Sequence, residues 1–127
     1  MLVEENKAFI RRYLEAVANE EKSEANINRF VADQELKDHI KMFEASFPRY
    51  QLVPEDIIAE GDRVVVRSTF VGTHLGDFMG IPATGKQVKM PLIIIYRLAD
   101  GKIVEHWMVA DVMSLMQQIS PVPVSAS

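Results

Sequence analysis

The fold of this chain is decided by the stretch GKIVEHWMVAD, residues 101–111. The Asp100-Gly101 pair at its start is typical of a two-residue β-hairpin turn, so the stretch is predicted to be the last strand of a curved antiparallel sheet. It carries the only tryptophan of the chain, Trp107, and it ends on an acid, Asp111. We therefore expect the floor of a pocket near the end of this strand.

Side chains along a strand point alternately to its two faces. If the ring of Trp107 faces the interior of the fold, alternation divides the strand into an inner and an outer set. The expected inner set is Glu105, Trp107, Val109 and Asp111, and the expected outer set includes His106 and Met108.

Three earlier stretches also have the residue pattern of strands. They span residues 50–60, 63–74 and 87–98. Pro54 in the first predicts an edge strand or a bulge, and Gly72 in the second predicts a bulge or a bend, because neither residue suits a regular central strand. In the third, the continuous apolar run at residues 92–96 implies burial on both faces.

Four segments are expected to be helical. They are residues 3–19, a short segment after Ser23, residues 34–47 and residues 112–119. Ser23, Asp33 and Asp111 precede the last three and are typical N-caps, since their side-chain oxygens accept from the free amides of a first turn. Pro48 ends the third helix. Helices followed by long antiparallel strands predict an α+β domain whose helices cover one face of a strongly curved sheet.

The size and charge of the chain exclude several classes of function. Its 127 residues suit one domain, expected over residues 1–119, with a flexible Pro- and Ser-rich tail at 120–127. A formal net charge of −4 with dispersed Lys and Arg argues against a nucleic-acid partner. Without cysteine there is no thiolate site, and no metal is expected. No signal peptide or apolar membrane span is visible, so we expect no membrane partner and a cytoplasmic location.

Several motifs along the predicted sheet carry a family likeness. They are GDRVVVR at 61–67, GTHLGDFMGIPATG at 72–85, DGKIVEHW at 100–107, Asp111, and LMQQ at 115–118. Together they resemble the SnoaL-like polyketide cyclases, often labelled ester cyclases, of the nuclear-transport-factor-2-like superfamily. The likeness covers about residues 55–119 and a matching first helix. It implies a cone-shaped barrel of the nuclear-transport-factor-2-like, cystatin-like type.

The resemblance also implies a chemistry. Characterised cyclases of the family close a ring by an aldol reaction on an aromatic polyketide ester, without metal or organic cofactor, using an acid on the last long strand. The matching position here is Asp111. Removing a proton beside a carbonyl needs a base at an apolar pocket, which fits this assignment. His74 is a separate candidate, as an electrostatic helper that donates to a substrate oxygen or orients Asp111. The structural alternatives are that Asp111 caps the last helix and that His74 holds the loop it introduces.

The interior of the expected cone must be filled by a ligand, by a partner or by its own side chains. Candidate substrate-binding residues are Trp107, Phe70, Tyr96, Phe78, Met79, Tyr13, His39, Met42 and Glu105. Between the second and third helices, longer relatives carry a loop that lines the pocket mouth, whereas residues 30–39 run almost directly from helix to helix. His39 is a candidate to take the place of that loop.

Two functions follow from these patterns. The first is a cofactor-independent enzyme that acts by acid/base catalysis on a small apolar or aromatic carbonyl or ester compound. The alternative is a non-catalytic, dimeric module that binds a small apolar ligand. The apolar run at residues 92–95 supplies both faces of the sheet, so we expect the outer face to form a homodimer.

Overall fold

A computed structural model describes residues 2–120 of the chain. The elements are α1 (Leu2–Asn19), α2 (Glu24–Asn28), α3 (Gln34–Ser46), β1 (Gln51–Glu60), β2 (Arg63–Thr73), β3 (Gln87–Ala99), β4 (Lys102–Ala110) and α4 (Val112–Ile119). The predicted α+β architecture is confirmed. Residues 121–127, most of the predicted flexible tail, lie outside the described residues.

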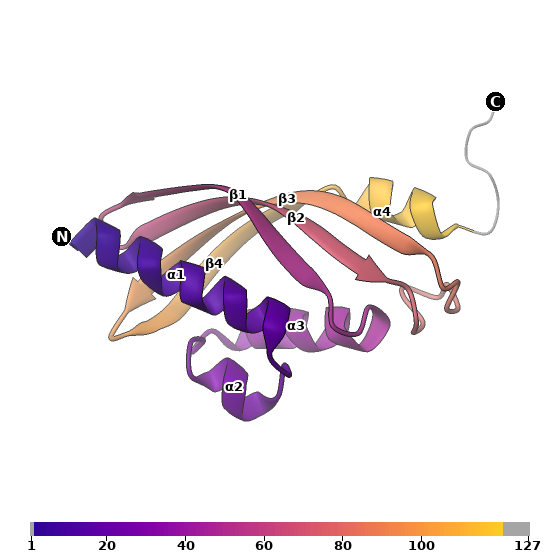
Figure 1. The fold of residues 1–127 in the computed structure, drawn as a ribbon, viewed down its shortest axis with the longest axis horizontal. Coiled ribbons are helices and arrows are strands. Elements are labelled where there is room, and N and C mark those ends of the chain that lie inside the picture. Colours follow the sequence, from indigo (N-terminus) through magenta and orange to yellow (C-terminus); the bar gives the residue numbers. More distant parts are fainter. Residues whose placement is uncertain (1, 121–127) are drawn as a thin grey trace.

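The four strands form one antiparallel sheet in the order β1-β2-β3-β4. Figure 1 shows this sheet as an arch, with α1, α2 and α3 on its concave side and α4 at the end of the sheet beyond β4. Apolar side chains of α1, among them Ile10, Leu14 and Val17, are buried toward the sheet. None of the described helices is long and apolar enough to cross a membrane.

The three predicted N-caps are confirmed. Ser23 Oγ accepts from the amide of Asn26 at 3.2 Å. Asp33 Oδ1 accepts from the first-turn amides of α3 at 3.0 and 3.3 Å. Asp111 Oδ1 accepts from the amide of Ser114 at 3.0 Å. These oxygens satisfy backbone donors that a helix leaves free at its start, which fixes where α2, α3 and α4 begin.

The connection from α2 to α3 docks on the free edge of β4. Val31 forms a parallel bridge with Ile103. The amides of Ala32 and Asp33 donate to the Ile103 carbonyl, and the Ile103 amide donates to the Phe30 carbonyl. This short connection therefore covers part of an edge that would otherwise expose unpaired backbone groups.

Two β-bulges shape the sheet. One lies in β1 between Pro54 and Asp56, as predicted from the proline. At Gly72, where a bulge or a bend was predicted, there is no bulge, because β2 keeps one continuous register with β3. Gly72 instead permits close packing, since a Cβ atom at this position would lie 3.0 Å from Cβ of Phe47. The second bulge was not predicted: in β4, Val104 is an extra residue between two paired neighbours.

The bulge at Val104 reverses the expected alternation of β4. Ile103 and His106 are three residues apart, yet both are buried on the inner face. From His106 onward the even-numbered residues point inward, because one extra residue exchanges the two faces.

The predicted inner set of β4 is therefore wrong. Trp107 is 44% and Val109 is 77% exposed. Glu105 and Asp111 are exposed as well, whereas His106 and Met108 pack inside.

The apolar run of β3 is buried on one face only, which corrects the expectation of burial on both. Leu92, Ile94 and Tyr96 are buried, whereas Ile93 is 47% exposed. The core consequently lies between the concave face of the sheet and the helices.

Candidate functional site

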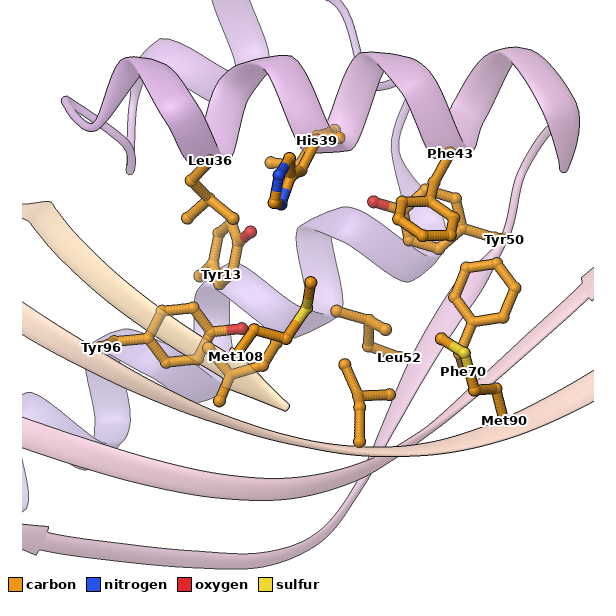
Figure 2. Close-up of a pocket in the computed structure, with 13 residues that line it drawn as sticks. Tyr13, Leu36, His39, Phe43, Tyr50, Leu52, Phe70, Met90, Tyr96 and Met108 are labelled. Atoms are coloured by element: carbon orange, nitrogen blue, oxygen red, sulfur yellow. The ribbon is translucent and has the colours of Figure 1, made fainter. Parts of the chain in front are cut away.

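The concave face of the sheet and α3 enclose a small apolar pocket, shown in Figure 2. Nine of its thirteen lining side chains are purely apolar, among them Phe43, Phe70, Met90 and Met108. The remaining four are Tyr13, His39, Tyr50 and Tyr96. The free space is about 40 Å³, far below the few hundred Å³ typical of ligand sites.

The three tyrosines of the chain all line this pocket. Figure 2 shows their hydroxyl groups directed toward the enclosed space. Burial raises the pKa of the Tyr13 hydroxyl. Burial is also the main cause that raises the pKa values of Tyr50 and Tyr96. Tyr13 and Glu44 add to the rise at Tyr50, and Tyr13 and Tyr50 add to it at Tyr96. All three groups therefore stay protonated at neutral pH and can donate a hydrogen bond. The Tyr96 hydroxyl is buried and has no hydrogen-bond partner within residues 2–120.

His39 enters the pocket from α3, as Figure 2 shows. Its Nδ1 atom is buried and also lacks a hydrogen-bond partner among the described residues. None of the side chains that line the pocket is acidic. Since phenols, thioethers and hydrocarbons do not accept a proton at neutral pH, the imidazole of His39 is the proton acceptor of this wall.

A second histidine lies next to His39. The His106 and His39 rings meet edge to face, with centroids 5.6 Å apart. Nδ1 of His106 lies 2.7 Å from Oδ2 of Asp33. Because a carboxylate only accepts, Nδ1 carries the proton of this bond. Nε2 of His106 is 3.9 Å from Oε1 of Glu35, which is too long for a hydrogen bond.

The Asp33–His106 pair was not predicted from the sequence. Asp33 was expected only as a cap, and His106 was expected on the outer face. The side chain of His106 is instead almost fully buried, and that of Asp33 is largely buried.

Lys22 is a buried lysine that supports the pocket wall at Tyr50. This role was not predicted from the sequence either. Nζ of Lys22 donates to the backbone carbonyl of Tyr50 at 3.0 Å and lies 4.3 Å above the centre of its ring. The same Nζ is 3.0 Å from Oε1 of Glu44, an ion-pair distance without the alignment of a hydrogen bond. These contacts hold Tyr50 in place at the pocket wall.

His74 is fully buried but does not line the pocket. Its Nδ1 accepts from the amide of Thr84 at 3.2 Å, and its ring lies 5.4 Å from that of Phe47. Backbone bonds join its amide to Lys86 and its carbonyl to Gly85. His74 therefore holds the loop between β2 and β3, which was the structural alternative.

The other predicted site residues divide into two groups. Tyr13, His39, Phe70 and Tyr96 lie in the pocket wall. Outside it lie Phe78, Met79, Met42, Trp107, Glu105 and Asp111.

Each residue outside the wall has a local reason for its position. Phe78 is buried behind the wall against Phe43 and Phe47. Met79 is exposed at a loop tip with a φ of 49°. Met42 is exposed because it lies off the stripe of α3 that faces the core.

The remaining three residues point away from the pocket, because the extra residue Val104 exchanges the two faces of β4. Trp107 and Glu105 point away from the core, and Glu105 bonds Arg97 on the outer face. Asp111 is exposed and caps α4. The expectation that Asp111 faces a pocket is therefore wrong in this fold.

Several solved structures are similar to the chain. AclR of Streptomyces galilaeus, a candidate hydroxylase, is 28% identical with a TM-score of 0.83, over 98% of this chain and 87% of that one. A candidate polyketide cyclase of Acidithiobacillus ferrooxidans is 25% identical with a TM-score of 0.74, over 90% and 93%. A candidate SnoaL-like polyketide cyclase of Jannaschia sp. CCS1 is 23% identical with a TM-score of 0.77, over 95% of each chain, and shows the shared fold.

Among curated proteins, no sequence matched the chain significantly. The family model of the SnoaL-like polyketide cyclases matches residues 6–119, which is nearly the whole chain. The match includes the four strands, α3 and every residue of the pocket wall. The chain belongs to the SnoaL-like polyketide cyclase family.

Proposed function

We propose that the pocket under α3 binds a small apolar or aromatic carbonyl or ester compound and that His39 acts on it as a general base. The chemistry would be the cyclisation or isomerisation expected of a SnoaL-like enzyme. It needs no metal or organic cofactor, because the base and the hydrogen-bond donors are side chains of the pocket wall.

One observation carries the proposal: Tyr96 Oη and His39 Nδ1 are both buried, both without a hydrogen-bond partner in residues 2–120, and both at one apolar pocket. An unpaired buried polar group costs about 1–3 kcal/mol. A ligand that carries an oxygen acceptor beside an acidic C–H bond would pair with both groups and recover this cost.

The reaction follows from these positions. His39 takes a proton from the carbon beside the carbonyl, and the C–H electron pair forms an enolate. The phenol of Tyr96, with Tyr13 and Tyr50 nearby, donates to the enolate oxygen, where a low dielectric strengthens the bond. The enolate carbon then attacks a second carbonyl carbon of the same molecule. The proton held by His39 moves to the alkoxide that this C–C bond formation leaves.

The small volume of the pocket requires its wall to move when a ligand enters. Met90 and Met108 are suited to this, since unbranched thioether side chains change rotamer at low cost. The second candidate is a non-catalytic module that binds a small apolar molecule without turnover, and the lack of an acidic side chain in the pocket wall favours it.

Exchange of the methyl protons of acetophenone for deuterium in D₂O, followed by NMR, tests the base directly. We expect the wild type to exchange faster than buffer, and His39→Gln to lower kcat by about 10²- to 10⁴-fold. Asp38→Asn, at an exposed acid beside His39 on α3, is the matched control and should retain the wild-type rate.

Wild-type exchange at the buffer rate would overturn the catalytic proposal. Acetophenone-induced shifts of pocket resonances without exchange would then establish the binding module instead. Exchange that persists in His39→Gln would show that another residue is the base.

A further inference from the structure

His106 is a neighbour of both residues of the pocket wall that carry an unpaired polar atom, Tyr96 and His39. Across the β3–β4 ladder it is directly opposite Tyr96, and both side chains point inward. Residues in such a pair have Cβ atoms about 4.5–5.5 Å apart. The His106 ring also packs edge to face against His39 from α3. One side chain thus borders the donor and the base of the proposed reaction.

The position of His106 is fixed by Asp33, whose two carboxylate oxygens have separate partners. Oδ1 caps α3, and Oδ2 holds Nδ1 of His106 at 2.7 Å. The carboxylate cannot rotate away without losing the helix cap. Since the backbone of Asp33 is also bonded to Ile103 on β4, the acid and the histidine belong to one rigid unit.

His39, in contrast, has no hydrogen bond that orients its ring from the Nδ1 side. A general base is usually held by a hydrogen bond to a third group. Here the ring of His39 is restrained by its edge-to-face contact with the ring of His106. Any tilt of the His106 ring would therefore change the direction of the His39 ring in the pocket.

We propose that the Asp33–His106 pair is a positioning device that orients the His39 base and the Tyr96 donor toward a bound carbonyl compound. The proposal rests on the proposed function for its catalytic consequence. The pair touches no ligand itself, and it acts only through the rings of His39 and Tyr96.

Two substitutions separate this role from the helix cap. Asp33→Ser keeps an N-cap oxygen but loses the bond to His106. His106→Phe keeps a ring beside His39 but loses the bond to Asp33. Glu35→Gln is the control, because Glu35 is an exposed acid near His106 that makes no hydrogen bond to it.

Two readouts are compared in variants whose circular dichroism spectrum is that of the wild type. In acetophenone exchange, we expect Asp33→Ser and His106→Phe to lower kcat by up to about 10²-fold, the typical cost of a small misplacement of a catalytic group, with a smaller change in KM. In long-range ¹H–¹⁵N imidazole spectra, we expect the His39 ring resonances to shift in both variants and to remain unchanged in Glu35→Gln.

Wild-type His39 resonances in a folded Asp33→Ser variant would overturn the positioning role, whatever the exchange rate shows. If the wild type does not exchange acetophenone, the proposed function fails, but the imidazole spectra still decide whether the pair orients His39. If Asp33→Ser does not fold, His106→Asn, which retains an N–H donor toward Asp33 without the ring, takes its place in both readouts.

Discussion

Nδ1 of His106 lies 2.7 Å from Oδ2 of Asp33, so the N-cap of α3 is hydrogen-bonded to the middle of β4. The two residues are 73 positions apart in the sequence. Because His39 follows Asp33 on α3 and Tyr96 pairs with His106 across the sheet, this contact links the two sides of the pocket wall.

Asp33→Ala is expected to destabilise the fold more than the loss of a cap alone. The cap contributes about 1 kcal/mol, and the buried Nδ1–H group of His106, left without an acceptor, costs about 1–3 kcal/mol. We therefore expect the free energy of unfolding to fall by about 2–4 kcal/mol, measured by urea denaturation. Asp33→Ser should lose less, since it keeps the cap. Because Asp33→Ser still lacks the bond to His106, an Asp33→Ser variant as stable as the wild type would contradict a separate contribution from the pair.

The three tyrosines predict how stability depends on alkaline pH. Burial raises the native pKa values of Tyr13, Tyr50 and Tyr96 above the unfolded value of about 10. Below pH 10 both states are protonated and these groups add no pH dependence. Above it the unfolded chain loses protons that the native state keeps, so stability falls by up to about 4 kcal/mol per pH unit when three phenols contribute.

Absorbance at 295 nm measures this directly, because these are the only tyrosines of the chain. We expect no phenolate signal near pH 10 in the folded protein and a single step that coincides with unfolding followed by circular dichroism. In urea the same chain should titrate near pH 10. A gradual titration of a folded protein would show that the phenols are not buried.

Much of the fold was predictable because strong local signals specify it. Asp100-Gly101 specifies the last hairpin, and Ser23, Asp33 and Asp111 specify where helices begin. The extra residue of β4 has no such signal. Val104 is a good strand residue, so nothing in its type distinguishes a bulge from a regular strand.

The consequence for the site was large because a single-residue shift exchanges two faces of a strand. Trp107 and Asp111 lie on the outer side, opposite to the prediction, and His106 and Met108 lie on the inner side. Tyr13 and Phe70 were predicted correctly on the pocket side because their elements carry no irregularity near them. The Asp33–His106 contact depends on both the bulge and the docking of α3, which local patterns do not encode.

Asp111 provides a test that separates the family's acid position from the pocket of this fold. Asp111→Ala should lower the free energy of unfolding by about 1 kcal/mol, because α4 loses its N-cap, and Asp111→Ser should restore most of it. Since the carboxylate is exposed outside the pocket wall, both variants should retain wild-type acetophenone exchange. Loss of exchange in a fully folded Asp111→Asn variant would assign the base to Asp111 and not to His39.

The outer face of the sheet carries an apolar row that crosses every strand. Ile58 pairs with Val65, Val65 with Ile95, and Ile95 with Trp107. Beside this row, Ile93 and Val109 are paired and exposed as well. We call these six residues the outer patch. In a single chain four of these side chains are exposed, whereas Val65 and Ile95 are half-buried. An apolar surface of this kind is typical of an interaction site.

The homodimer expected from the sequence remains a prediction, and the outer patch is where we expect the second copy to bind. Trp107→Glu places a charge at the one aromatic residue of the outer patch, which would be a hot spot, so the dimer dissociation constant should rise by at least about 30-fold. Light scattering after size exclusion, over a range of protein concentrations, measures this change. Leu75→Glu, at a similarly exposed leucine of the loop after β2, is the matched control and should dimerise like the wild type.

Because the inner face of β4 carries the pocket residues and the outer face carries the patch, Trp107→Glu should leave acetophenone exchange by His39 unchanged. A wild type that is monomeric at all concentrations would contradict the dimer, and a Trp107→Glu variant that still dimerises would place the interface elsewhere.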